Sequence, residues 1–279
     1  MPADQQNPKP STAVSQAGSV RRRIARCLDG RVEHDEDWVA SELPVALSYN
    51  GQAHVVMLAT PNDLEDFALG FSLSEAIIAT PQELALIEIR ERLEGIVIDM
   101  HIPQPRAEAI AARQRNLSGR SSCGLCGTQQ LEDVMRHPAA VAAGIRTSGE
   151  VLHRALRSLE AAQPLNQRTG ATHAAAWVDG RGDLLRVRED VGRHNALDKL
   201  IGVMAREALD VREGFLILTS RASYEMVQKA ASVGIGLIAA ISAPTALAIH
   251  LAESSGVTLI GFARSNSHVI YTHPQRIVG

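Results

Sequence analysis

The chain has 279 residues, which is enough for one large domain or two small ones. Hydrophobic residues make up 45% and charged residues 21%, as in ordinary globular proteins, which excludes a largely disordered chain, a coiled coil and a collagen. The formal net charge of -3 lacks the basic excess of most duplex nucleic-acid binders, and 3% aromatic residues leave few stacking platforms for single strands.

The beginning of the chain predicts an unstructured tail. Residues 1–20 are rich in Pro, Gln, Ser and Ala and lack any periodicity, so we expect them to be disordered. The first clear structural signal is the dipeptide Asn50-Gly51, which predicts a hairpin between the strands Leu43–Tyr49 and Gln52–Leu58.

A helix and a second strand pair are predicted after this hairpin. Thr60 is a favourable N-cap and Pro61 suits the first helical position, so a helix is expected to begin there. The strand pair is predicted over Leu84–Glu91 and Gly95–Ile102. Residues 21–115 are therefore predicted to form a small α+β module.

Residues 116–279 are predicted to form a layered α/β domain with a central sheet. The polar stretch Arg106–Arg120 predicts a helix followed by a loop, and further on strands alternate with helices, the pattern of a sheet covered by helices. The predicted strands are His173–Val178, Leu184–Arg188, Gly214–Thr219, Leu237–Ile241, Val257–Ala263 and His268–Tyr271, and the predicted helices are Ser148–Ala162, Asn195–Ala208, Ser223–Val233 and Pro244–Ser254.

No stretch predicts a membrane span or a secretion signal. The most apolar stretch, Val233–Ile249, is shorter than the ~20 residues that a span requires, and Pro244 interrupts it. Arg21-Arg22-Arg23 has the form of a twin-arginine signal, but acidic residues follow where such a signal has an apolar run. We therefore expect a cytoplasmic protein.

The sharpest candidate for chemistry is the motif Cys123-Gly124-Leu125-Cys126-Gly127. Structural zinc normally requires four ligands, and the sequence has no second C-x-x-C to complete such a set. A redox dithiol usually lies near the start of a βαβ unit, whereas this motif follows a polar loop in mid-chain. A third possibility is a thiolate that carries a group such as a persulfide, and the fourth is a pair of buried small residues. The spacing alone does not rank the third first.

Polar clusters follow several predicted strands, where α/β sheets bind ligands. Arg193, His194 and Asn195 stand at a predicted helix start, a favourable place for an anion. Arg221 lies in the next strand-to-helix turn. Helix capping and solvated charge explain these clusters equally well. The last cluster follows the apolar strand residues Val257–Ile260. Its alternative interpretation is an ordinary hairpin turn. The cluster contains Phe262, Ala263, Arg264, Ser265, Asn266 and Ser267.

Taken together, the motifs resemble those of the formate dehydrogenase accessory sulfurtransferase family, FdhD. The resemblance covers nearly the whole chain after residue 20, and although each motif alone is weak, their ordered set is specific. The stretches that carry it are Asp63–Phe71, Cys123–Gly127, Asp190–Lys199, Ser220–Val227, Ser242–Thr245 and Gly261–Arg264.

The resemblance implies a sulfur carrier. Family members accept sulfur as a cysteine persulfide from a cysteine desulfurase and pass it to the molybdenum cofactor, Mo-bis-molybdopterin guanine dinucleotide, before that cofactor enters formate dehydrogenase. It implies Cys123 as the persulfide carrier, Cys126 as an auxiliary thiol and cofactor contact by Phe262–Ser267.

The resemblance also implies a cytidine deaminase-like fold with a smaller α+β part, and a homodimer. No tightly bound metal, nucleic acid or membrane partner is expected. Two alternatives remain open: a thiol-disulfide redox protein, and a chaperone that binds the molybdenum cofactor without transferring sulfur.

Overall fold

The computed structural model describes residues 15–16, 18–118, 138–142 and 144–278. Its first part is built on a four-stranded sheet in the order β5-β4-β7-β6. The predicted hairpin is confirmed: Asn50 and Gly51 both have positive φ, 49° and 76°, as the tight turn between β4 and β5 requires. The strands are β4 Leu43–Tyr49, β5 Gln52–Ala59, β6 Leu86–Arg92 and β7 Gly95–His101.

Two helices belong to this part, α1 (Leu64–Ser74) and α2 (Gln104–Ser118). Phe67 of α1 and Ile110 of α2 join one apolar core with the inward-facing residues of β4 and β7. The predicted helix start was wrong, because α1 begins at Leu64 and its N-cap is Asp63, which has a φ of 54°. Thr60 instead is fully buried, and its backbone N–H and its hydroxyl both donate to Asp190.

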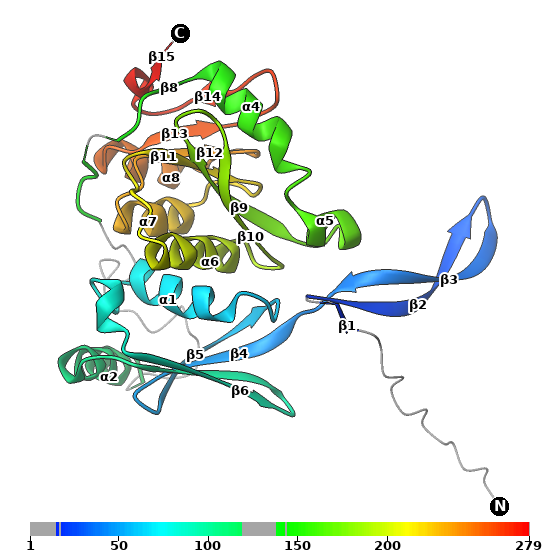
Figure 1. Cartoon of the computed structure of the whole chain (residues 1–279), viewed down its shortest axis with the longest axis horizontal. Coiled ribbons are helices and arrows are strands. Elements are labelled where there is room, and N and C mark those ends of the chain that lie inside the picture. Colours follow the sequence, from blue (N-terminus) through cyan, green and yellow to red (C-terminus); the bar gives the residue numbers. More distant parts are fainter. Residues whose placement is uncertain (1–14, 17, 119–137, 143, 279) are drawn as a thin grey trace, which may run out of the picture.

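A long hairpin leaves the body of the molecule ahead of β4 (Figure 1). It consists of β2 (Ser19–Leu28) and β3 (Arg31–Ala40), and the short β1 (Ser15–Gln16) pairs with its root. The prediction that the unstructured tail extends to residue 20 is therefore wrong, because β2 already begins at Ser19. Residues 1–14 and 17 of the predicted tail lie outside the described part. Charged residues occupy both faces of this hairpin, so the sequence lacks the alternation that predicts a half-buried strand.

The second part is layered around a six-stranded sheet in the order β10-β9-β11-β12-β13-β14. The neighbours β11, β12 and β13 run parallel, and the other pairs are antiparallel. The layered α/β domain with a central sheet, accompanied by a smaller α+β part, is thus confirmed. The strands are β9 His173–Asp179, β10 Leu184–Asp190, β11 Gly214–Leu218, β12 Leu237–Ala240, β13 Thr258–Gly261 and β14 Val269–Ile270.

Helices cover both faces of this sheet. On one face α4 (Gly149–Leu159) packs on residues such as Phe215 and Ile217, with Ser148 as its N-cap. The intervening strand residues, such as Leu216, point to the opposite face of the sheet. There they pack against α6 (Arg193–Arg206), α7 (Tyr224–Ser232) and α8 (Ala246–Ser254). Shorter elements complete the part: α5 Pro164–Thr169, and β8 Thr147–Ser148 paired with β15 Ile277–Val278. Two 3-10 turns are η1 Pro81–Glu83 and η2 Pro274–Arg276.

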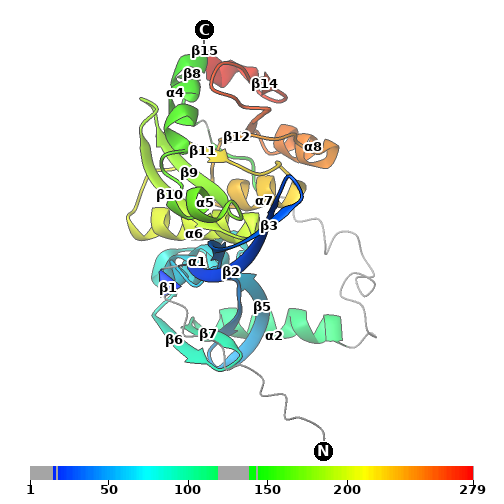
Figure 2. The same ribbon diagram turned by 90° about the vertical axis from the view of Figure 1, so that its right-hand side faces the viewer.

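The two parts meet where α1 crosses α6, and α1 lies between α6 and the first sheet (Figures 1 and 2). Two glycines permit the crossing. A Cβ built on Gly70 would lie 1.7 Å from the carbonyl oxygen of Asp198, and one on Gly202 would lie 1.9 Å from that of Asp66. Any side chain at either position would therefore force the helices apart.

Buried ion pairs tie the same joint together. Lys199 Nζ lies 2.7 Å from Asp190 Oδ2, and both side chains are fully buried. Lys229 Nζ lies 3.0 Å from Asp198 and 2.8 Å from Glu75 of the first part. Burial alone would lower the pKa of Lys229, but these two carboxylates together hold it above its ordinary value. Lys199 also donates to the Thr60 hydroxyl of the first part at 2.8 Å, so both lysines connect the two parts and their ammonium groups are already paired.

Candidate functional site

The polar clusters that are far apart in the sequence meet at one edge of the central sheet, where β11, β12 and β13 end. The end of β10 lies at this edge too, because Asp190 is in register with His173 at the beginning of β9. Beside it, the Thr219 hydroxyl accepts a hydrogen bond from the Ala174 N–H at 2.8 Å. Phe262 N–H donates to the Ser242 carbonyl at 3.2 Å, which joins the ends of β13 and β12. Ligands of open α/β sheets bind at such carboxyl ends, so we call this edge the carboxyl edge.

The start of α6 presents Arg193 and His194 at the carboxyl edge. Arg193 Nε is buried and has no hydrogen-bond partner in the described part of the chain. His194 Nε2 lies 2.7 Å from Glu225 Oε2, which links the beginnings of α6 and α7. Burial lowers the pKa of His194 although Glu225 favours its charged form, and burial together with Arg193 also lowers the pKa of His173. Burial therefore favours the neutral form of both imidazoles.

Asn195 has a different environment from its two neighbours. Its side chain is buried, and its two amide hydrogens donate to the Leu58 carbonyl at 2.7 Å and to Asp190 Oδ1 at 2.9 Å. It therefore fastens α6 to the first part of the chain. These contacts give no support to the prediction that Asn195 contacts a cofactor.

The turn after β11 contributes Arg221 and Ser223. Arg221 is exposed. Ser223 stands at the N-cap position of α7, yet its hydroxyl caps nothing and is a second buried polar atom without a partner in the described residues. Neither Ser223 nor His173 was predicted, because a serine before a helix indicates a cap and a histidine opening a strand carries no signal.

The predicted cluster after β13 forms a compact turn. Arg264 N–H donates to the Ser267 carbonyl at 2.8 Å, and its Nη1 donates to the carbonyls of Ile241 and Ala263. Arg157 of α4 holds the turn from the other side through the Ser265 carbonyl at 3.0 Å. The side chains of Phe262 and of residues 264–267 are exposed, whereas that of Ala263 is 1% exposed and packs in the core. Ala263 can offer a ligand only its backbone.

The chain has three cysteines, Cys27, Cys123 and Cys126. Cys123 and Cys126 lie outside the described residues, so their position relative to the carboxyl edge is not defined. Cys27 is exposed on β2 of the long hairpin as a free thiol. In the described part of the chain, no three His, Cys, Asp or Glu side chains gather in a way that could hold a metal ion. Among the same residues, no helix has the length and apolarity needed to cross a membrane.

Replacing His194 by glutamine tests whether the start of α6 serves a ligand or only stability. On the role that the resemblance implies, we expect the formate dehydrogenase activity of cells to fall about tenfold, because one polar contact to the molybdenum cofactor is lost. The melting temperature should change by no more than about 2 °C, since His194 is only partly buried. Enzyme activity in cells and thermal unfolding of the purified variant measure the two effects. A large loss of stability with normal activity would assign His194 to capping instead.

Comparisons with known proteins show which proteins this chain is similar to. The sequence profile of the FdhD/NarQ family matches residues 40–278. Sulfur carrier protein FdhD of Xanthomonas campestris pv. campestris (strain B100) is 54% identical over 269 residues, which are 96% of this chain and 95% of that protein. Sulfur carrier protein FdhD of Cupriavidus necator is 52% identical over 254 residues, or 91% and 88% of the two chains.

The fold is also that of a solved structure. The crystal structure of a formate dehydrogenase accessory protein from Desulfotalea psychrophila superposes with a TM-score of 0.72. It covers 93% of this chain and 99% of its own, at 24% sequence identity. Together with the profile match and the relatives above half identity, this leads to one conclusion: the chain belongs to the FdhD/NarQ family.

Proposed function

We propose that this chain is a cytoplasmic sulfur carrier that acts as a homodimer. It accepts a persulfide sulfur from a cysteine desulfurase on Cys123 and passes it to the molybdenum of Mo-bis-molybdopterin guanine dinucleotide. That substrate then enters formate dehydrogenase. The names of the curated relatives support the sulfur role, and the resemblance of the motifs supports the identity of donor and acceptor.

The proposed sulfur transfer uses both thiols of the C-x-x-C motif. The Cys123 thiolate attacks the outer sulfur of the desulfurase persulfide, and the desulfurase cysteine leaves as its thiolate, so no net oxidation occurs. In the second step the Cys126 thiolate attacks the inner sulfur of the Cys123 persulfide. Sulfide leaves and replaces an oxo ligand of the molybdenum, which departs as water. The resulting Cys123–Cys126 disulfide returns to two thiols through a cellular dithiol reductant.

The observation that carries the proposal is the gathering of unused donors at the carboxyl edge. The substrate carries two diphosphates, and arginine forks and helix starts are the groups that bind phosphate. Arg193, Arg221 and Arg264 come from three different strand ends to this one edge. The buried Arg193 Nε and Ser223 hydroxyl have no partner in the described chain, as expected for donors whose acceptor is a ligand.

Mass spectrometry of the purified protein tests the proposal. After incubation with a cysteine desulfurase and cysteine, we expect about 32 Da of extra mass on the peptide that contains Cys123, and none on a Cys123→Ala variant. A Cys123–Cys126 disulfide that forms and opens with reductant, without any sulfur adduct, would assign the chain to redox proteins. Cofactor binding without sulfur on Cys123 would leave a chaperone.

Arg264 is predicted to contact a diphosphate of the substrate. Its guanidinium is oriented by the Ala263 carbonyl of the turn and by the Ile241 carbonyl after β12, and its side chain is exposed, so an anion can reach it. GDP, as a fragment of the substrate, should bind with micromolar to millimolar affinity, one copy per protomer. Arg264→Ala should weaken that binding about tenfold in calorimetric titration. Arg212→Ala, which removes an exposed arginine paired with Asp210, is the matched control. Equal affinity of wild type and Arg264→Ala removes Arg264 from the site.

A further inference from the structure

A pair of histidines fastens the turn after β13 to α4. We call residues 262–267 the carboxyl-edge turn; His268 follows this turn directly, and its Nδ1 lies 3.0 Å from Nε2 of His153 on α4. The two rings are inclined at 64° with their centres 5.1 Å apart, so they meet edge to face. A Cβ built on Gly149 would lie 3.1 Å from His268 Cε1, so the beginning of α4 packs against this ring. We call His153 and His268 the histidine pair.

The position of the carboxyl-edge turn depends on this contact. Arg157, one helical turn after His153, donates to the Ser265 carbonyl at 3.0 Å. The Arg264 N–H donates to the carbonyl of Ser267, which adjoins His268, at 2.8 Å. A movement of His268 away from α4 is therefore expected to displace the turn and the Arg264 side chain with it.

The number of protons on the histidine pair decides whether the contact holds. A hydrogen bond between two imidazoles requires one N–H and one lone pair. The neutral pair meets this condition, and so does a pair with one added proton, because the charged ring donates to the neutral one. When both rings are protonated, both facing nitrogens carry a hydrogen and both rings are positive. At a separation of 3.0 Å the contact then becomes repulsive.

The charges around the histidine pair do not compensate this repulsion. Glu150, three residues before His153 on the same helix, favours the first proton on that ring. Burial and the neighbouring His153 lower the pKa of His268 below its ordinary value of about 6.5, so the second proton binds only at acid pH. Arginines outnumber carboxylates on the surrounding elements. Their titratable or charged side chains are Glu150, Arg154 and Arg157 of α4, Arg264 of the carboxyl-edge turn, Tyr271 after β14, and Asp179, Arg181 and Asp183 at the turn between β9 and β10.

We infer that the histidine pair is a proton-controlled latch that positions the carboxyl-edge turn. At neutral pH the pair is hydrogen-bonded and the turn is held against α4. When both rings are protonated they separate, the turn is displaced, and Arg264 loses the position from which it would bind a diphosphate. The inference rests on the proposed function for this last consequence alone, because the movement itself requires no ligand.

NMR titration of the full chain from about pH 8 to about pH 5 tests the latch. Side-chain signals of His268 report its protonation, and the backbone amide of Arg264, which donates to Ser267, reports the turn. In the wild type we expect the Arg264 amide signal to shift with the same midpoint as His268, while the amide of Leu216 in the core stays in place. An Arg264 amide that does not shift over this range overturns the inference.

Two substitutions of His153 alter the response in predictable ways. Glutamine can donate or accept and does not titrate, so in His153→Gln the turn should stay in place down to about pH 5. In His153→Glu the carboxylate pairs with protonated His268, so the pKa of His268 should rise and the turn should again stay in place. His34→Gln removes an exposed imidazole of the projecting hairpin and should titrate as wild type. A pH-dependent shift of the Arg264 amide that persists in His153→Gln overturns the inference.

Two other imidazoles lie at the carboxyl edge and provide the competing explanation. His194 lies 2.7 Å from Glu225, and His173 is the first residue of β9. His194→Gln and His173→Gln should each leave the pH-dependent shift of the Arg264 amide as in the wild type. Loss of the shift in either variant, with the shift retained in His153→Gln, would assign the movement to the start of α6 or of β9 and overturn the inference.

Inorganic pyrophosphate tests the consequence for the site, because it offers a diphosphate alone. The ratio of its affinities for His153→Gln and wild type cancels the ionisation of the probe itself. In calorimetric titration we expect this ratio to be near unity at about pH 7.5 and at least about threefold at about pH 5.5, as the fraction of molecules with a positioned turn falls. Equal affinities at both pH values would overturn the regulation of the site.

Sulfur loading of Cys123, measured by mass, separates the latch from the proposed function. Loading in a chain whose carboxyl-edge turn does not respond to pH refutes the latch alone. A turn that moves with the protonation of His268 in a chain that never loads sulfur refutes the proposed function and supports the latch.

Discussion

Replacing Cys123 by alanine is expected to reduce formate dehydrogenase activity to background in cells that carry only the variant. Alanine has no sulfur with which to accept the outer sulfur of a donor persulfide, and no other residue of the motif stands first in the C-x-x-C pair. The fold should be unaffected, because the core clusters and the ion pairs of the joint lie elsewhere in the chain. Enzyme activity in cell extracts and circular dichroism of the purified variant provide the two measurements.

The other two cysteines are the controls. Cys126→Ala should retain part of the activity, since sulfur still loads on Cys123 and an external thiol can release it slowly. Cys27→Ser should behave as wild type, because Cys27 is an exposed residue of the projecting hairpin. Full activity of Cys123→Ala, or none in Cys27→Ser, would contradict the assignment of the carrier.

The largest effect on stability is expected from Asp190→Asn. Asp190 is fully buried, faces Lys199 Nζ at 2.7 Å and accepts from Thr60, Gly192 and Asn195. Asparagine would turn an N–H₂ group toward these donors and leave the Lys199 charge without its partner. Breaking one side of a buried pair costs about 3–5 kcal/mol of unfolding free energy. For a chain of this size the melting temperature should fall by on the order of 10 °C.

An exposed aspartate gives the matched comparison. Asp210→Asn removes a carboxylate that pairs with Arg212 at the surface, where solvent screens the interaction. Thermal unfolding of both variants should show a clear loss for Asp190→Asn and little change for Asp210→Asn. Comparable losses in the two would mean that the network around Asp190 does not hold the parts of the chain together.

Local sequence signals were sufficient to predict most of the helices and strands. Asn50-Gly51 fixed the first hairpin because few other residue pairs adopt two consecutive positive φ angles. The alternation of strands and helices in the second half predicted the layered sheet. The start of α1 was mispredicted because Thr60 has the residue type of a cap, while its partner is Asp190, 130 positions later. The projecting hairpin of β2 and β3 was missed because its strands bury no face, and burial is what produces a periodic pattern.

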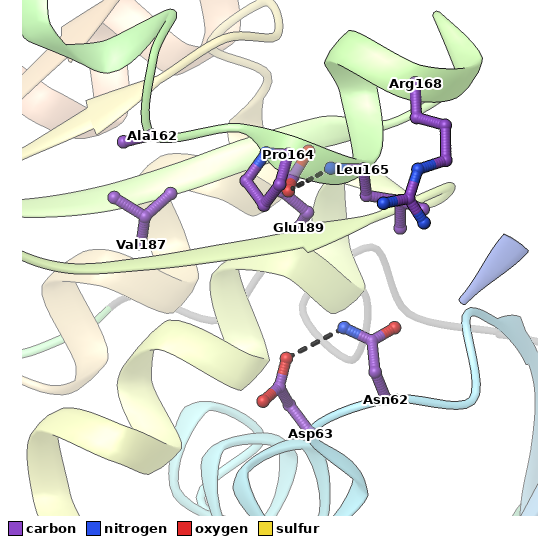
Figure 3. A pocket seen from close by; sticks show the side chains of 8 residues that line it. All are labelled: Asn62, Asp63, Ala162, Pro164, Leu165, Arg168, Val187 and Glu189. Carbon is purple, nitrogen blue, oxygen red and sulfur yellow. Dashed lines mark hydrogen bonds between the residues drawn. The ribbon is translucent and has the colours of Figure 1, made fainter. Parts of the chain in front are cut away.

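The candidate site was predictable to a similar degree. That Arg193, Arg221 and Arg264 share one edge follows from the rule that parallel strands end on the same side of a sheet. The separate role of Asn195 could not be predicted, because it depends on the Leu58 carbonyl of the first part. The hollow that Asn62 and Arg168 line from opposite sides (Figure 3) was also not predicted, since it depends on the packing of α5, a short helix for which the sequence gives no clear signal.

The contact of Gly70 with Gly202 limits the motions that the molecule can make. Helices that touch through long side chains can slide past one another when those side chains change rotamer. At this crossing backbone meets backbone, so there is no side chain to rearrange, and we expect α1 and α6 to move as one rigid body. Opening the molecule along this joint would also separate Asp190 from Thr60. We therefore expect the proposed bis-dinucleotide substrate to bind at the carboxyl edge without a hinge motion between the two parts.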